Sequence, residues 1–136
     1  MTHLILHGAI ILFLANLMGF PLGRAKASKR SSPEKTEAWR MAHSANTGFG
    51  VFLLAVAGIF SHLVLTETMD CVIATSLISS GYGFLTGTFI AAITGHRGLK
   101  IKGPFVNYVA FGCYMVGVLG SMVGVPLIIL GSLKAL

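Results

Sequence analysis

The histidines offer the clearest chemistry in this sequence, and His43 is the most unusual of the five. It stands in the stretch TEAWRMAHSANTGFGVFLLAV, residues 36–56, where a long apolar run has already begun. An imidazole in such surroundings needs partners for its ring nitrogens, and ionisable groups in apolar spans are usually functional. Because neutral imidazole is a common metal ligand, His43 is a candidate ligand.

Small and hydrogen-bonding residues share the helix face of His43. At about 100° per residue, Asn46, Thr47, Gly50 and Ala57 project to the same side. A flat cofactor needs an axial imidazole beside a surface with little side-chain bulk, and this face provides both. The alternative is that His43 bonds a neighbouring helix while the small residues serve packing.

The other histidines lie elsewhere along the predicted helices. His62 is 19 residues beyond His43, or about 28 Å at helical rise, so the two cannot bind one ion. His3 and His7 are spaced i, i+4 and could form a metal cluster with His62. No carboxylate is clearly placed to complete it, and interfacial histidines usually bond water or headgroups. His96, in a basic loop flanked by glycines, is expected to be exposed.

The composition is that of an integral membrane protein. Of 136 residues, 54% are hydrophobic and 10% are charged, whereas about a quarter are charged in soluble domains. Four segments contain no acid, Lys or Arg: 4–22, 41–66, 71–95 and 105–133. About 20 such residues cross a bilayer as a helix, and continuous apolar runs argue against barrel strands. We therefore predict a single all-α domain, residues 1–136, built as a bundle of four transmembrane helices.

Local signals refine the helix bounds. Ser32, Pro33 and Glu34 form an N-cap, first-position proline and acidic first turn, so the second helix is expected to begin near residue 33. Trp39 then lies at the membrane interface, with His43 about one turn deeper. The first segment lacks the basic start of a signal peptide and is interpreted as a mature helix. The predicted helices are about 4–22, 33–66, 71–95 and 105–133.

Basic residues predict the orientation. The first loop carries Arg24, Lys26, Lys29, Arg30, Lys35 and Arg40, and the third carries Arg97, Lys100 and Lys102. The second loop has none, so loops one and three are predicted to face the cytoplasm and both termini the outside of a bacterial-type inner membrane. The net charge of +6 is thus a topology signal, because no nucleic-acid-binding motif accompanies it.

Small residues dominate the last two segments. GxxxG spacings relate Gly83 to Gly87 and Gly120 to Gly124, while a seven-residue spacing relates Gly117, Gly124 and Gly131. These faces predict close helix packing in a bundle or oligomer. Asn107 lies near the same membrane side as His43. Tyr114 lies about two turns deeper and is either a ligand donor or a packed aromatic.

Four motifs resemble those of the styrene oxide isomerase family: EAWRMAHS, HGAIILFLANLMG, RGL and CYMVGVL, which together sample all four helices. The resemblance implies a homotrimer that binds haem b between neighbouring subunits. It makes His43 the axial iron ligand, and Thr47 and Gly50, which share its helix face, would then lie beside the cofactor. The implied reaction is Lewis-acid opening of a small apolar, aryl epoxide-like substrate and a 1,2-hydride shift that gives an aldehyde.

The substrate side departs from the family. Carried across without gaps, the family's catalytic tyrosine, asparagine and aspartate fall on Thr88, Phe49 and Ser80. We therefore expect an altered substrate pocket with polar partners drawn from Asn46, Tyr82, Thr88, Asn107 and Tyr114.

Two functions remain open. One is a haem-dependent isomerase, and the alternative is a non-enzymatic haem protein such as a sensor, carrier or electron-transfer cytochrome. No second axial histidine lies at the right depth unless His96 folds inward, which favours an open coordination position. A transporter subunit is disfavoured because the spans lack carboxylates.

Overall fold

A computed structural model describes residues 2–28, 31–95 and 101–136 of the chain, and the part described is helical with no strand. The elements, in order, are α1 (Thr2–Leu17), α2 (Gly19–Ala27), α3 (Pro33–Ile59), a short 3-10 turn η1 (Phe60–His62), α4 (Glu67–Thr94) and α5 (Phe105–Leu133). The all-α prediction is confirmed.

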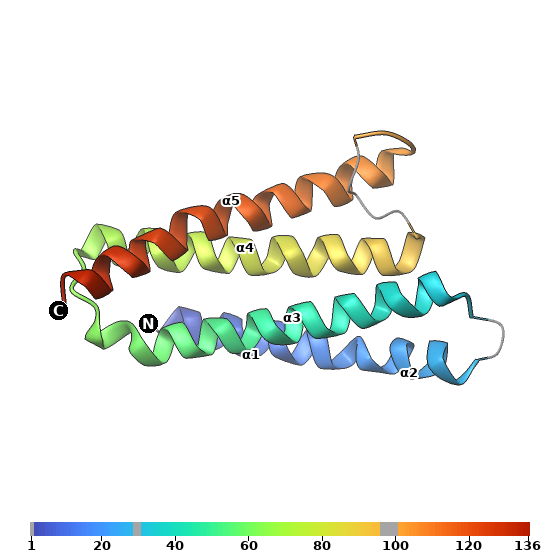
Figure 1. Ribbon diagram of the computed structural model, residues 1–136, viewed down its shortest axis with the longest axis horizontal. Coiled ribbons are helices and arrows are strands. Elements are labelled where there is room, and N and C mark those ends of the chain that lie inside the picture. Colours follow the sequence, from blue (N-terminus) through green and yellow to red (C-terminus); the bar gives the residue numbers. More distant parts are fainter. Residues whose placement is uncertain (1, 29–30, 96–100) are drawn as a thin grey trace.

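The described residues contain four segments long and apolar enough to cross a membrane: Thr2–Ala27, Pro33–His62, Glu67–Thr94 and Phe105–Leu133. The chain is therefore a multi-pass membrane protein. The spans run antiparallel in two layers, with α1 beside α3 and α4 beside α5 (Figure 1). Both ends of the chain lie at the same end of the bundle, together with the α3–α4 connection.

Two helix starts show where the sequence patterns were informative. α3 begins at Pro33 as predicted, because the Ser32 hydroxyl accepts a hydrogen bond from the backbone N–H of Lys35 at 3.2 Å. α4 begins at Glu67 rather than at 71. Thr66 caps it by accepting from the N–H of Met69 at 3.3 Å, so the helix starts in the polar loop before the apolar run.

Two predicted ends differ as well. The second helix was predicted to reach 66 but ends at Ile59, and a 3-10 turn follows. The first was predicted as one helix over 4–22, but α1 stops at Leu17 and α2 continues to Ala27. Pro21 explains this break, because it has no N–H and its ring conflicts with the carbonyl four residues earlier, that of Leu17. At the break, the Met18 N–H contacts the carbonyls of Leu14 at 3.2 Å and Ala15 at 3.1 Å.

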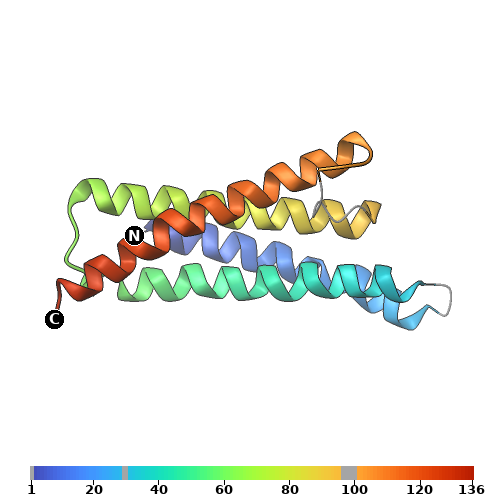
Figure 2. The same ribbon diagram turned by 45° about the horizontal axis from the view of Figure 1, so that its top comes forward.

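The glycine pattern produces the closest helix contact, between α4 and α5, which cross obliquely (Figure 2). Ala110, Gly117, Gly124 and Gly131 are the buried small residues of α5 and are spaced by seven. Gly117 and Gly124 face α4, whereas Gly131 meets Leu63 and Leu65 in the connection before it. A Cβ on Gly83 would lie 2.7 Å from both the Cys113 carbonyl oxygen and the Gly117 nitrogen. The prediction of close packing through these glycines is confirmed.

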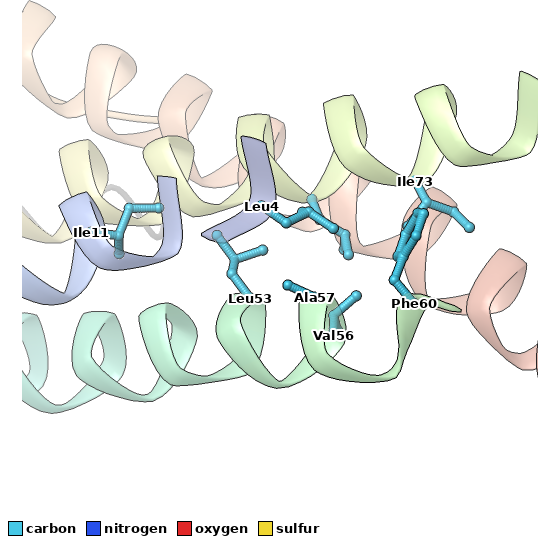
Figure 3. Close-up of a cluster of buried hydrophobic side chains, with 8 residues drawn as sticks. Leu4, Ile11, Leu53, Val56, Ala57, Phe60 and Ile73 are labelled. Atoms are coloured by element: carbon cyan, nitrogen blue, oxygen red, sulfur yellow. The ribbon is translucent and has the colours of Figure 1, made fainter. Parts of the chain in front are cut away.

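An apolar cluster fills the bundle near the chain ends. Leu4 and Ile11 of α1 meet Leu53 and Val56 of α3 and Ile73 of α4 (Figure 3). α5 packs along α4, reaches this cluster through the half-buried Leu127 and Ile128, and leaves many large apolar side chains exposed. Those exposed faces suit lipid or another subunit.

The α4–α5 contact predicts that two glycine substitutions will differ in their effect on stability. We expect Gly83→Ala to destabilise the protein by about 1–3 kcal/mol, because the added methyl group meets backbone atoms that cannot yield. Gly112→Ala, on α5 with no atom within 4 Å of the new Cβ, should be neutral or slightly stabilising. Thermal unfolding in detergent measures both, and equal midpoints would contradict the assignment.

Candidate functional site

His43 is oriented by one hydrogen bond to the backbone of the first span. Its Nδ1 lies 2.8 Å from the carbonyl oxygen of Ala15. A carbonyl oxygen only accepts, so Nδ1 carries a proton, and in the neutral imidazole Nε2 keeps its lone pair. Within the described residues, no hydrogen bond reaches Nε2. This is the pattern of a metal-ligating histidine, whose second ring nitrogen usually donates to a carbonyl or carboxylate.

The break between α1 and α2 provides this acceptor. In a continuous helix the Ala15 carbonyl would be bonded by the N–H of residue 19. Here the partners found for it in the described chain are the N–H of Met18 and the His43 ring. Gly19 lies beside the same ring, since a Cβ there would be 3.7 Å from its Nδ1 and Cε1. The junction of α1 and α2 thus forms one wall of the His43 site.

The face expected to support a flat cofactor is partly covered. Gly50 lies under α1, where a Cβ would come within 2.9 Å of the Leu12 nitrogen. Thr47 donates its hydroxyl to the His43 carbonyl at 2.7 Å, a bond within its own helix. α1 therefore occupies the space at Gly50 that the sequence analysis left for a cofactor. His43 itself remains half-buried.

Asn46 and Thr88, two of the expected polar partners, meet between α3 and α4. The Asn46 Nδ2 donates to the Thr88 hydroxyl at 2.8 Å and to the Ala42 carbonyl at 2.7 Å. The Thr88 hydroxyl in turn donates a hydrogen bond to the Phe84 carbonyl at 2.8 Å. Met18, in the helix break, adds its sulfur at 3.7 Å from the same nitrogen. Each of these neighbours accepts a hydrogen bond, so the amide must be oriented with Nδ2, and not Oδ1, toward them.

The carbonyl oxygen of the Asn46 side chain is buried without a hydrogen bond. The residue is 0% exposed, and its Oδ1 has no hydrogen-bond partner in the described chain. An orphan acceptor in an apolar interior costs about 1–3 kcal/mol and is rare in native proteins. Such an atom is a candidate for contact with a ligand or for stabilising charge.

Tyr82 does not join this group. Its hydroxyl bonds Nδ1 of His7 at 2.9 Å, with the rings edge to face and centroids 5.6 Å apart. His3, His7 and His62 do not form the metal cluster that their spacing left possible, because the described residues contain no group of three or more histidines, cysteines or acids able to hold an ion. His96 lies outside the described residues.

Asn107 and Tyr114 are held apart from His43 on α5. Asn107 donates to the Lys102 carbonyl at 2.7 Å and so organises the start of its own helix. The Tyr114 ring covers Gly87, where a Cβ would lie 3.0 Å from it. The structure thus brings together Asn46 and Thr88, next to the junction that holds His43. The feature that sequence reasoning missed is the Ala15 carbonyl, and its signal was Pro21 inside an apolar run.

Comparison with known families decides the relationship. The family model described as styrene oxide isomerase matches residues 1–133, nearly the whole chain. The chain belongs to the styrene oxide isomerase family. No curated protein matches the sequence. This match to the styrene oxide isomerase family confirms the resemblance drawn from the four motifs.

In this styrene oxide isomerase family member, two positions where the resemblance places polar residues carry side chains that serve helix packing. Ser80, where the resemblance places an aspartate, is fully buried and donates to α5 at the Gly117 carbonyl at 2.5 Å. Its oxygen also lies 2.6 Å from the Ser121 hydroxyl. Phe49, where the resemblance places an asparagine, packs against Phe84 with ring centroids 5.7 Å apart.

The orphan oxygen predicts an unusual stability result. Asn46→Leu should leave the free energy of unfolding within about 1 kcal/mol of wild type or raise it, because it removes an unpaired acceptor and strands no partner. Ser80→Ala, which breaks a satisfied link to α5, should lower it by about 0.5–1.5 kcal/mol. Thermal unfolding in one detergent compares them. A large loss for Asn46→Leu would show that the amide is structural.

Proposed function

We propose that this protein is a haem b-dependent membrane isomerase that converts a small apolar epoxide into a carbonyl compound. Membership of the styrene oxide isomerase family supports the isomerase class. The observation that carries the haem proposal is the bond from His43 Nδ1 to the Ala15 carbonyl, which presents Nε2 as a free ligand atom.

The residues present fit a haem ligand site. His43 would hold the iron through Nε2, and Ala15 would keep the ring oriented and strengthen its basicity. When bound, ferric haem supplies a Lewis acid for an epoxide oxygen. The rearrangement of an epoxide to an aldehyde moves one hydride within the substrate and consumes no external electrons or protons.

We assign charge stabilisation on the substrate side to Asn46. The negative end of its amide dipole, the unpaired Oδ1, suits a carbon that gains positive charge as an epoxide ring opens. Thr88 orients this amide through its hydroxyl. The apolar surroundings exclude water, which would otherwise trap the cation as a diol. Because Tyr82, Asn107 and Tyr114 are engaged or placed elsewhere, the proposed pocket rests on Asn46 and Thr88.

The proposed assembly and orientation follow from the family and from charge. We propose a homotrimer with haem between subunits, which agrees with the half-buried position of His43 and the large exposed apolar surface of the chain. We propose that loops one and three face the cytoplasm and that both termini face outward, since the basic residues gather in those loops. An inner membrane of bacterial type is the proposed location.

One observation favours the second candidate, a non-enzymatic haem-binding membrane protein. Thr88, Phe49 and Ser80 stand where the resemblance places the tyrosine, asparagine and aspartate that position an epoxide. In the structure, Ser80 and Phe49 serve helix packing. A chain that kept the ligand and lost these groups would bind haem without turning over an epoxide.

Substitution of His43 tests the haem proposal. We expect purified protein to show a haem Soret band that His43→Ala loses and that added imidazole restores by filling the vacated ligand position. His62→Ala, which changes an exposed histidine in the η1 turn that follows α3, should leave the band intact. Absorption spectra of equal protein amounts compare the three. An unchanged band in His43→Ala would refute the ligand assignment.

Turnover of aryl epoxides tests the isomerase proposal. We expect aldehyde formation by the ferric protein and a fall of about 100-fold in kcat for Asn46→Leu, the effect typical of losing one preorganised electrostatic group. Ser44→Ala, which removes an exposed hydroxyl from the same helix, should retain activity. Chromatography of the products gives the rates. If no aldehyde forms in either oxidation state and the haem is six-coordinate and low-spin, the non-enzymatic alternative holds.

A further inference from the structure

Two adjoining hollows lie on the side of the α1–α2 junction away from His43. The first has a volume of about 470 Å³, and its walls include Leu14, Leu17, Leu85 and Phe89. Thr86 is the polar residue that lines it. We call this hollow the apolar slot.

The second hollow, about 770 Å³, opens at the end of the bundle that carries the first loop. Arg24 and Lys35 line it, and so do three serines: Ser28, Ser31 and Ser32. We call it the basic bowl. Among its described lining residues there is no Asp or Glu. The nearby Glu37 is paired with Arg40, at 2.6 Å between oxygen and nitrogen, and Glu34 lines a neighbouring hollow.

Pro21 and Trp39 line both hollows, so the slot and the bowl meet at these two residues. Trp39 has one edge against the apolar interior, where its ring centroid lies 6.0 Å from that of Phe89. Trp39 itself is only 8% exposed, but the bowl is lined by charged and hydroxyl residues at the first-loop end, and the slot by apolar residues further along the spans. The apolar slot therefore lies at acyl-chain depth and the basic bowl at headgroup depth.

A ligand that fills both hollows needs an apolar chain and an anionic head joined at the membrane interface. We propose that the slot and bowl bind one anionic phospholipid, with an acyl chain against Leu14 and Phe89 and the phosphate at Arg24 and Lys35. Two cations and several hydroxyls suit a phosphate, which accepts hydrogen bonds and carries charge. Basic pockets between transmembrane helices bind such headgroups in general.

This site is separate from the proposed haem site. Ala15 and Gly19 of the junction face the His43 ring, whereas Leu14, Leu17, Met18 and Pro21 line the slot. The lipid proposal does not rest on the proposed function, so it stands or falls independently of haem binding and catalysis.

The chain provides its own reporter, because Trp39 is its one tryptophan and lines both hollows. The full protein is placed in nanodiscs of phosphatidylcholine with increasing fractions of phosphatidylglycerol brominated on one acyl chain. The matched series uses brominated phosphatidylcholine. Bromine quenches indole on contact, so the mole fraction that halves the fluorescence reports the affinity of each lipid for this site.

We expect half-quenching at a mole fraction at least about fivefold lower for phosphatidylglycerol than for phosphatidylcholine, as one to two cations near a headgroup would produce. Arg24→Gln combined with Lys35→Gln should bring the two lipids within about twofold of each other. Lys26→Gln combined with Lys102→Gln removes the same charge from residues outside the bowl and should preserve the preference.

A second variant tests the slot. Thr86→Phe places a ring into the slot from an exposed position, so it should weaken quenching by both brominated lipids while Arg24 and Lys35 remain. Haem content, read from the absorption spectrum, is matched across the samples.

Three results would overturn the proposal. Equal quenching by both lipids in the wild type would mean only ordinary contact with surrounding lipid. If the Lys26 and Lys102 double variant lost the preference for phosphatidylglycerol as fully as the Arg24 and Lys35 double variant, diffuse surface charge would explain that preference. A Trp39 that neither lipid quenches would mean that another subunit covers the groove.

Discussion

The hydrogen bond between His43 and Ala15 links the break in the first span to a side chain of the second span. It needs a carbonyl that is available to a side chain, and a continuous helix would not offer one. Pro21 interrupts the first span and leaves the Ala15 oxygen facing α3. The bond then selects one tautomer of the imidazole and so determines which ring nitrogen is left for a ligand. A backbone defect in one helix thus sets the chemistry of a side chain in another.

Sequence patterns predicted the parts of this arrangement that depend on local rules. The capped start of α3 at Pro33 and the buried glycines of α5 follow from Ser32 and from the seven-residue repeat, and both are found. The break at Met18 was missed because hydropathy averages over a window and does not register one absent N–H. Partners across helices were also out of reach. Asn46 could be named as polar, but its pairing with Thr88 depends on how α3 and α4 are rotated.

The α1–α2 junction presents different surfaces to its two sides. Toward α3 it offers polar backbone and the small Gly19, which leave room for the His43 ring. On the other side it offers leucines, Met18 and Pro21, which line an apolar hollow. Met18 also touches the Asn46 amide, so the same short segment borders both the His43 ring and the Asn46 side chain. A substitution in this segment would therefore alter the surroundings of the histidine ring and of the amide together.

The serine at position 80 restricts which side chains the α4–α5 contact can accept. Its hydroxyl donates to the Gly117 carbonyl and lies against the Ser121 hydroxyl, so a carboxylate here would meet one oxygen that repels it and one hydroxyl that can donate to it. Ser80→Asp would bury an anion against the lone pairs of the Gly117 carbonyl, with the Ser121 hydroxyl as its neighbouring donor. The close fit of α4 against α5 at this point therefore depends on a side chain that is small, neutral and able to donate one hydrogen bond.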